Sequence, residues 1–238
     1  MQIPLNMFHW YIGIPVVFFF AVRGLMSAHK TKNRITLYMG ISGLLFTLCL
    51  SLYGLPPLFT TDSQILTITT ILGDVLQFLA LWVMWMAVAR IYAPSRPWLR
   101  RLIVGLDFLL VLVGVWFSLR ENLTTPVTLI QQANGAWQIN FGFSLGYEIV
   151  TALQFMSLIF VAAKFWSQAR GVSDSSQMWR LRSIALGFFI IGASYLIRPL
   201  TNSGTYNVTL SAMIAVGIVI SGLFVFATMF LNKKTVQR

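Results

Sequence analysis

Acidic residues and cysteines are scarce in this sequence of 238 residues. It contains six Asp and Glu residues against 17 Lys and Arg residues, and charged residues make up only 10% of the chain. Ordinary soluble domains have about 25% charged residues, so the composition excludes that class. The single cysteine, Cys49, lies inside an apolar segment. One cysteine excludes an internal disulfide framework and a cysteine-based metal site.

The sequence also lacks the residue patterns of common catalytic and cofactor sites. It has two histidines, His9 and His29, and we find no Ser/His/Asp set, no His-Glu-x-x-His pattern and no glycine-rich phosphate loop. Residues 208–231 contain no lysine, which excludes the Schiff-base retinal attachment of microbial rhodopsins. We therefore expect no enzymatic activity, no cofactor and no bound metal. Asn122-Leu-Thr and Asn207-Val-Thr match the N-glycosylation pattern, which matters only in a eukaryotic secretory route.

Long apolar segments dominate the chain instead. Hydrophobic residues make up 57% of it, and a helix that spans a membrane needs about 20 mostly apolar residues. Seven segments meet this requirement: 7–27, 35–59, 65–91, 101–119, 144–167, 183–202 and 207–231. Because they use most of the chain, we expect residues 1–238 to form a single membrane domain. The predicted fold is an all-α bundle of seven transmembrane helices.

Basic residues are concentrated at alternate connections between these segments and at the segment ends beside them. All but two of the 17 fall into four clusters: Arg23/Lys30/Lys32/Arg34, Arg90/Arg96/Arg100/Arg101, Lys164/Arg170/Arg180/Arg182 and Lys233/Lys234/Arg238. The other two, Arg120 and Arg198, lie on the opposite side of the predicted bundle. The positive-inside rule therefore predicts a cell-membrane protein with an exterior N-terminus and a cytoplasmic C-terminus. Clusters beside apolar segments are typical of contact with an anionic inner leaflet, and we expect no nucleic-acid partner.

The exterior loop 120–143 contains a hairpin pattern. Asn134-Gly135 is a strong two-residue turn signal and is flanked by alternating residues. That turn predicts three opposed pairs: Gln132 with Trp137, Ile130 with Ile139, and Thr128 with Phe141. One face would then carry the apolar residues Ile130, Trp137, Ile139 and Phe141. We expect this face to cover the exterior mouth of the bundle; the alternative is an irregular loop.

Apart from members of the basic clusters, five Asp, Glu, His and Arg residues fall inside the predicted spans, where charge is costly and marks functional or packing sites. They are His9, Asp74, Asp107, Glu148 and Arg198. Asp74 is the most informative, because it lies about 13 Å inward from the start of its helix and is too short to reach water. We expect His9 to lie at the interface and Asp107 to pair with neighbouring arginines. Glu148 and Arg198 can either extend to the interface or pair inside the bundle.

Most of these residues lie in the outer half of the predicted bundle, close to polar and aromatic residues at helical spacing. The sequence therefore predicts an exterior-facing ligand pocket formed by Trp10, Asp74, Gln77, Tyr147, Glu148, Tyr195 and Arg198. Arg198 is expected to pair with either Asp74 or Glu148, because an isolated charge near hydrocarbon is unfavourable.

Residues 134–143, with the sequence NGAWQINFGF, combine a Gly-x-Trp-like hairpin with a Phe-Gly-Phe start of a helix. This segment resembles a recurrent stretch in the seven-helix N-terminal sensor regions of bacterial histidine kinases and related receptors. The resemblance implies a receptor-like sensing module. Those families continue into a cytoplasmic signalling domain, whereas this chain ends at Arg238. We therefore expect it to act through a separate membrane or cytoplasmic protein partner.

These observations favour a receptor that binds a small or amphipathic ligand from the exterior. Two other hypotheses remain. The chain could be a proton-coupled transporter of ions or small solutes, with Asp74 and Glu148 as coupling sites, or a structural subunit of a membrane protein complex.

Overall fold

The computed structural model describes Pro4 and residues 8–131, 133, 135, 137–201 and 212–220. Its elements in chain order are α1 (Phe8–Thr31), α2 (Arg34–Gly54), η2 (Pro56–Leu58), α3 (Ser63–Tyr92), α4 (Pro97–Thr124), β1 (Thr128–Gln131), β2 (Trp137–Asn140), α5 (Leu145–Ala169), α6 (Ser175–Ile197) and η3 (Arg198–Thr201). Six of the described helices are long and apolar enough to cross a membrane, so the chain is a multi-pass membrane protein. Of the predicted seventh span, only residues 212–220 are described, and they are helical.

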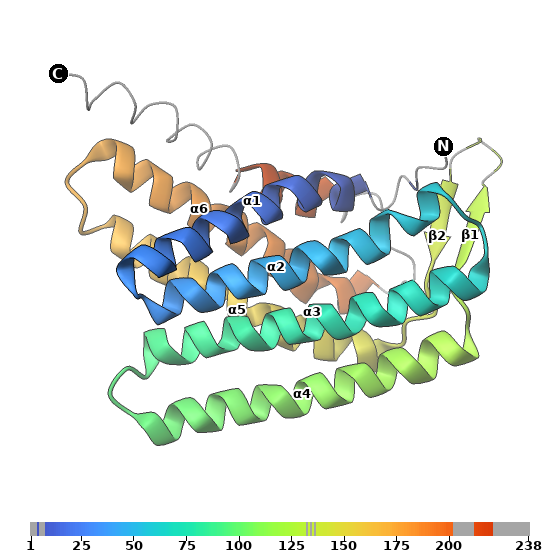
Figure 1. Cartoon of the computed structure of the whole chain (residues 1–238), viewed down its shortest axis with the longest axis horizontal. Coiled ribbons are helices and arrows are strands. Elements are labelled where there is room, and N and C mark those ends of the chain that lie inside the picture. The colour runs from blue at the N-terminus through green and yellow to red at the C-terminus, as the bar shows by residue number, and fades with distance from the viewer. Residues whose placement is uncertain are drawn as a thin grey trace.

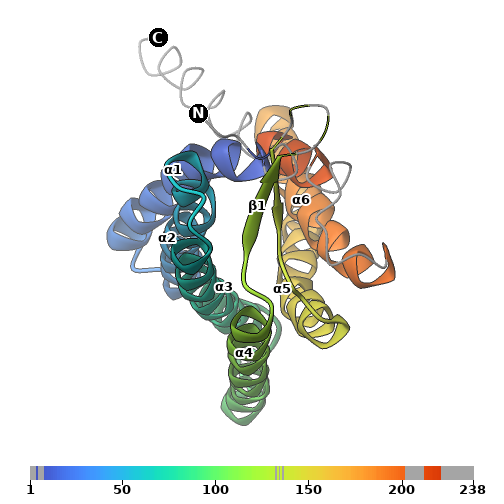
Figure 2. The same cartoon turned by 90° about the vertical axis from the view of Figure 1, so that its right-hand side faces the viewer.

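The helices form two layers. Each of α1 to α4 packs against the next, and together they form a curved layer that faces α5 and α6 (Figure 1, Figure 2). α3 contacts α2, α4 and α5, and α3 and α5 are among the most buried spans. α4 exposes apolar side chains such as Leu106, Leu112 and Leu119 on its outer face. Such a face is expected where a helix meets lipid.

The two ends of the bundle differ. The hairpin β1–β2 lies at one end, which we call the hairpin end, and the α1–α2, α3–α4 and α5–α6 connections lie at the other (Figure 1). The first three predicted basic clusters belong to those connections and the adjoining helix turns, so we call this second end the basic end. Helices begin at capping side chains at both ends, with Asn33 and Asp174 at the basic end and Asp62 and Ser144 at the hairpin end.

Two helices extend at one end by five or more residues beyond the predicted apolar segments. α4 continues past residue 119 to Thr124, so its last turns form part of the protein interior. α6 begins at Ser175, eight residues before the predicted start at 183. The predicted start was wrong because Arg180 and Arg182 were assigned to the connection. In the structure, the Arg182 guanidinium carbon lies 5.7 Å from the ring centroids of both Trp166 and Trp179, which accommodate its charge within the helix.

The hairpin is present, but its predicted register is wrong by one residue. Gln131 pairs with Trp137 and Leu129 pairs with Ile139, so the connecting loop is longer than two residues. Gly135 has a φ of 81°, which suits the left-handed position of such a loop. In this register Val127, Ile139 and Phe141 are buried against the bundle. The one-residue shift turns Ile130 outward, where it is 49% exposed.

Hydrogen bonds to α3 hold the start of the hairpin in place. The Ser63 hydroxyl donates to the carbonyl of Val127 at 2.7 Å, and the amide of Val127 donates to the Thr67 hydroxyl at 2.9 Å. Ser63 and Thr67 are four residues apart and so lie on one face of α3. The hairpin is therefore attached directly to the helix that carries Asp74.

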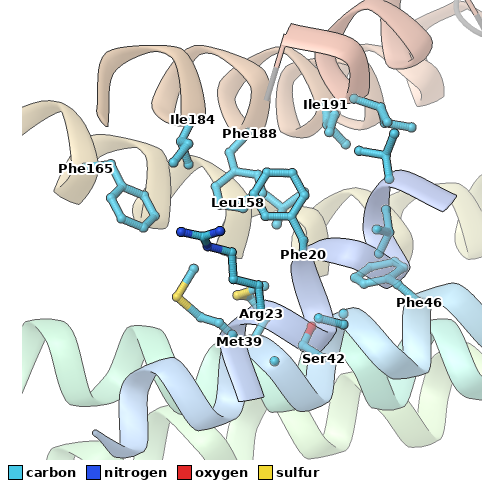
Figure 3. Close-up of a pocket in the computed structure, with 18 of the residues that line it drawn as sticks. Phe20, Arg23, Met39, Ser42, Phe46, Leu158, Phe165, Ile184, Phe188 and Ile191 are labelled. Atoms are coloured by element: carbon cyan, nitrogen blue, oxygen red, sulfur yellow. The ribbon is translucent and has the colours of Figure 1, made fainter. Parts of the chain in front are cut away.

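A cavity of about 430 Å³ lies between the two layers. α1 and α2 line one side of it, and α5, α6 and residues Ile214 and Ile218 line the other (Figure 3). Its walls are mostly apolar, with Phe46, Leu158 and Phe188 among them.

Candidate functional site

The Asp74 side chain is fully buried and joins four helices. Its carboxylate accepts hydrogen bonds from Tyr53 of α2, Ser118 and Asn122 of α4, and Tyr147 of α5. The Tyr147 hydroxyl is 2.6 Å from the carboxylate and the Asn122 amide nitrogen is 3.4 Å away. Several hydrogen-bond donors to one carboxylate stabilise its charge in a buried site. Asp74 therefore acts as a hydrogen-bonded centre for α2, α3, α4 and α5.

Small local features bring these donors together. Gly73 leaves room for the Tyr53 ring, because an added Cβ at Gly73 would stand 2.6 Å from a ring carbon. Ser118 and Asn122 are four residues apart and therefore lie on one face of α4. The Asn122 amide also donates to the backbone carbonyl of Ser118 at 2.9 Å.

Asn122 is only 1% exposed, so its glycosylation pattern is not accessible in the folded protein.

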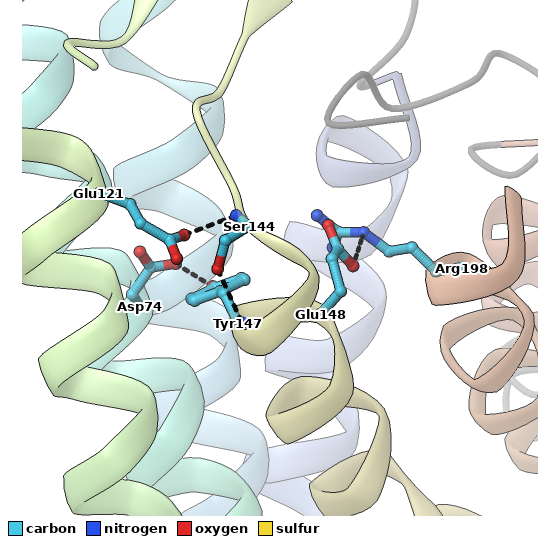
Figure 4. Close-up of polar contacts among 6 residues, drawn as sticks. All are labelled: Asp74, Glu121, Ser144, Tyr147, Glu148 and Arg198. Carbon is cyan, nitrogen blue, oxygen red and sulfur yellow. Dashed lines mark hydrogen bonds and ion pairs between the residues drawn. The ribbon is translucent and has the colours of Figure 1, made fainter. Parts of the chain in front are cut away.

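A buried ion pair lies close to this centre. The Nε of Arg198 is 2.6 Å from a carboxylate oxygen of Glu148, and both side chains are less than 10% exposed (Figure 4). Arg198 therefore pairs with Glu148, one of the two predicted partners, and neither residue extends to the interface. Burial makes the pair sensitive to substitution, because removing one partner leaves the other charge uncompensated.

Stacked aromatic rings connect the hairpin to the Asp74 centre and to the ion pair of Glu148 and Arg198. Phe141, which directly follows β2, stacks on Phe143 with ring centroids 5.0 Å apart, and Phe143 stacks on Tyr147 at 4.2 Å. The guanidinium carbon of Arg198 lies 5.4 Å from the Phe143 centroid. Trp10 stacks on Tyr53 at 5.0 Å and meets Phe141 edge-on. Movement of the hairpin would therefore be transmitted to Tyr147 and Arg198.

Glu121 is a part of this region that the sequence analysis missed. Its carboxylate accepts a hydrogen bond at 2.8 Å from the backbone amide of Ser144, the residue that caps α5 (Figure 4). The Ser144 hydroxyl in turn accepts from the amide of Tyr147 at 3.3 Å. Because the predicted fourth span stopped at 119, Glu121 was assigned to a solvated loop. The spacing of Gly114, Ser118 and Asn122 along one helical face was the available indication of a longer helix.

Six of the seven residues of the predicted pocket form two neighbouring groups. Asp74, Tyr147 and Trp10 belong to the first, and Glu148, Arg198 and Tyr195 to the second, in which the Tyr195 centroid is 5.9 Å from the guanidinium carbon of Arg198. Gln77 is buried one turn along α3 from Asp74. The cavity between the layers is lined by Tyr195 and by none of the other six. Whether these residues bind a ligand stays a prediction.

Two predictions about single residues were wrong. His9 was expected at the interface, but it is 1% exposed and lines the cavity. Asp107 was expected to pair with arginines, yet it is 4% exposed and forms no ion pair with them. Among the residues that the structure describes, the one ion pair is that of Arg198 and Glu148. Asp107 lies on the buried face of α4, whereas Arg100 and Arg101 lie near the exposed start of that helix.

Within the described parts of the chain, no group of three or more His, Cys, Asp and Glu side chains is arranged to hold a metal ion. No protein-family model matches the chain, and no curated protein sequence matches it.

Proposed function

We propose that the chain is a receptor-like membrane sensing module that binds a small or amphipathic ligand at the hairpin end and acts through a separate protein partner. The proposed topology has seven spans, with the hairpin end outside the cell and the basic end in the cytoplasm. It is supported by the grouping of the first three basic clusters at one end of the described bundle.

One observation carries this proposal. The hydrogen bonds to Asp74 join four helices, and the stack of Phe141, Phe143 and Tyr147 connects this carboxylate to the hairpin. A ligand that displaces the hairpin would shift Tyr147 and so change how the helices are joined. A ligand shifts a protein between two states by binding them with different affinities. The proposed signal is such a change in the relative positions of α2 to α5.

The ion pair of Glu148 and Arg198 supplies a recognition element in this proposal. A guanidinium forms strong, directional hydrogen bonds with carboxylates and phosphates. A ligand with an anionic group could compete with Glu148 for Arg198 beneath the hairpin. Such exchange would also disturb the contact between Arg198 and the Phe143 ring.

A thermal-stability screen tests the proposal. The purified chain in mild detergent is screened against small anions and amphiphiles. A compound that binds the folded state raises the melting temperature in a concentration-dependent way. Compounds that act at the proposed site should stabilise the wild type and not Arg198→Gln. Co-purification of a protein partner that changes with such a compound would support signalling. Stabilisation that is identical in both proteins would refute the proposed site.

A proton-coupled transporter is the second candidate, and the buried polar face of α5 favours it. Tyr147, Thr151, Gln154 and Ser157 follow one another along α5 and are at most 1% exposed. Asp74 contacts Tyr147 at one end of this series, and Asp107 of α4 is a second buried carboxylate. Buried carboxylates on a polar path are typical of proton relays in membranes. Proteoliposomes loaded with a pH-sensitive dye distinguish the candidates, because a transporter carries protons without a partner.

A further inference from the structure

The cavity between the two layers has the properties of a ligand site at the basic end. Its volume of about 430 Å³ lies within the range of about 300–1,000 Å³ typical of small-molecule sites. Phe20, Met39, Phe46, Leu158, Phe188 and Ile191 contribute apolar walls from four helices (Figure 3). Such walls suit an acyl chain or another extended apolar group.

Two arginines line the same cavity. Arg23 of α1 and Arg180 of α6 are both partly buried, and they lie close enough for their charges to repel each other. Figure 3 shows the Arg23 guanidinium directed into the cavity. All six acidic residues are within the described part of the chain, and none forms an ion pair with either arginine. Two adjacent cations beside an apolar cavity are unfavourable unless an anion lies between them.

Other arginines at the basic end have aromatic partners. Arg182 lies over Trp166 and Trp179, and Arg90 lies over the Tyr38 ring with 5.3 Å between its guanidinium carbon and the ring centroid. Arg180 is only two residues from Arg182 on α6, yet it lines the cavity. Arg182 is therefore a matched control for Arg180, because it lies on the same helix turn and contacts aromatic rings.

The length of the cavity suits one acyl chain. Arg23 and His9 both line it and are 14 residues apart on α1, a distance of about 21 Å along a helix. One leaflet contributes about half of the roughly 30 Å hydrocarbon core of a bilayer. The distance from Arg23 to His9 is therefore somewhat greater than the thickness of one leaflet, and an acyl chain that begins at the arginines and extends part of the way toward His9 has the orientation of a lipid in the leaflet at the basic end.

We propose that this cavity binds a single-chain anionic amphiphile of the fatty-acid class. Its carboxylate lies between Arg23 and Arg180, and its acyl chain extends between the two layers toward His9 and Tyr195. This site meets the one proposed at the hairpin end only at Tyr195, and its ligand belongs to the leaflet at the basic end.

Native mass spectrometry with palmitate tests this site on the full chain released from neutral detergent. The wild type should bind one palmitate per chain and should bind the uncharged methyl palmitate far more weakly. Arg23→Gln and Arg180→Gln should each weaken palmitate binding by about tenfold or more, because each removes a charge-assisted contact. Arg180→Lys should retain most of the affinity, and the control Arg182→Gln should bind like the wild type. Ile184→Trp, which fills part of the cavity, should abolish binding.

Melting temperatures establish that each variant is folded before binding is compared. Equal binding of palmitate and methyl palmitate, or equal effects of Arg180→Gln and Arg182→Gln, would overturn the proposal and indicate non-specific apolar binding. Absence of palmitate binding by the folded wild type would also overturn it. A disulfide between Phe20→Cys and Phe224→Cys in a Cys49→Ala background would then identify residues 221–231 of the chain itself as the occupant.

Discussion

Asp74 and Glu148 are both buried carboxylates, but they are stabilised in different ways. Asp74 accepts hydrogen bonds from the neutral side chains of Tyr53, Ser118, Asn122 and Tyr147, whereas Glu148 is neutralised by Arg198. Loss of one hydrogen-bond donor leaves Asp74 with three others. Loss of Arg198 removes the one described ion-pair partner of Glu148. The two carboxylates should therefore respond differently to substitution of their neighbours.

Asp74→Asn should destabilise the protein by about 2 kcal/mol, because the hydrogen bonds lose their ionic acceptor and the new amide group faces donors. The matched control is Asp62→Asn, which makes the same change at the exposed N-cap of the same helix. Asn and Asp cap helices equally well, so that effect should stay below about 0.5 kcal/mol. Thermal or denaturant unfolding in detergent measures both. Equal effects would show that Asp74 is not a centre of stability.

Glu148→Gln and Arg198→Gln should each cost on the order of 3–5 kcal/mol, since each leaves a buried charge without its partner. The double variant should cost clearly less than the sum of the two. A parallel cycle with Asp74→Asn and Arg198→Gln should be closer to additive, because Arg198 forms its ion pair with Glu148. Unfolding free energies of the six proteins provide the measurement. Strong coupling only in the second cycle would contradict the observed pairing.

At the scale of elements, the hairpin and the last turns of α4 are ordered by their contacts with the rest of the bundle. β1 contributes only four residues and β2 another four, and so short a hairpin is at best marginally stable in water. The hairpin is ordered by its buried face and by the bonds of Val127 to Ser63 and Thr67. α4 continues to Thr124 because Ser118, Glu121 and Asn122 find polar partners inside the protein.

Substitutions on the two faces of the hairpin test its register. Ile139→Ser should destabilise the protein by at least about 2 kcal/mol, because Ile139 is 1% exposed and its loss leaves a cavity with a polar group in it. Ile130→Ser should change stability by no more than about 0.5 kcal/mol, because Ile130 is on the outer face. Thermal melting of both variants in detergent gives the comparison. Similar losses for the two would favour the register of a two-residue turn.

At the scale of the whole molecule, the two ends of the described bundle differ in their charged groups. The hairpin end holds Asp74, Glu121 and Glu148 inside the bundle, whereas the basic end carries three clusters of Lys and Arg on connections and helix ends. The clusters are near the surface, where anionic headgroups can contact them. This asymmetry is the physical basis of the proposed orientation.

Cysteine labelling in intact cells tests that orientation. In a Cys49→Ala background, Gln131→Cys on the exposed part of β1 should react with a membrane-impermeant maleimide. Lys32→Cys in the α1–α2 connection should react only after permeabilisation. The expected difference follows from the positive-inside rule. Labelling of Lys32→Cys in intact cells, with protection of Gln131→Cys, would reverse the topology.

The amino-acid sequence by itself determined the membrane class of this protein, the presence of its first six spans and the grouping of basic residues at one end. These features depend on the length of apolar segments and on the order of charges along the chain, which are local properties. It also identified Asp74, Glu148 and Arg198 as unusual, because each places charge inside an apolar segment.

The tertiary structure decided the partners of those residues. The pairing of Arg198 with Glu148 and the four donors to Asp74 join residues that are distant in sequence. The hairpin register and the full length of α4 likewise depend on which side chains find space and hydrogen-bond partners in the bundle. The register and the helix length are determined by packing between helices, and the hydropathy pattern along the sequence does not show which side chains pack together.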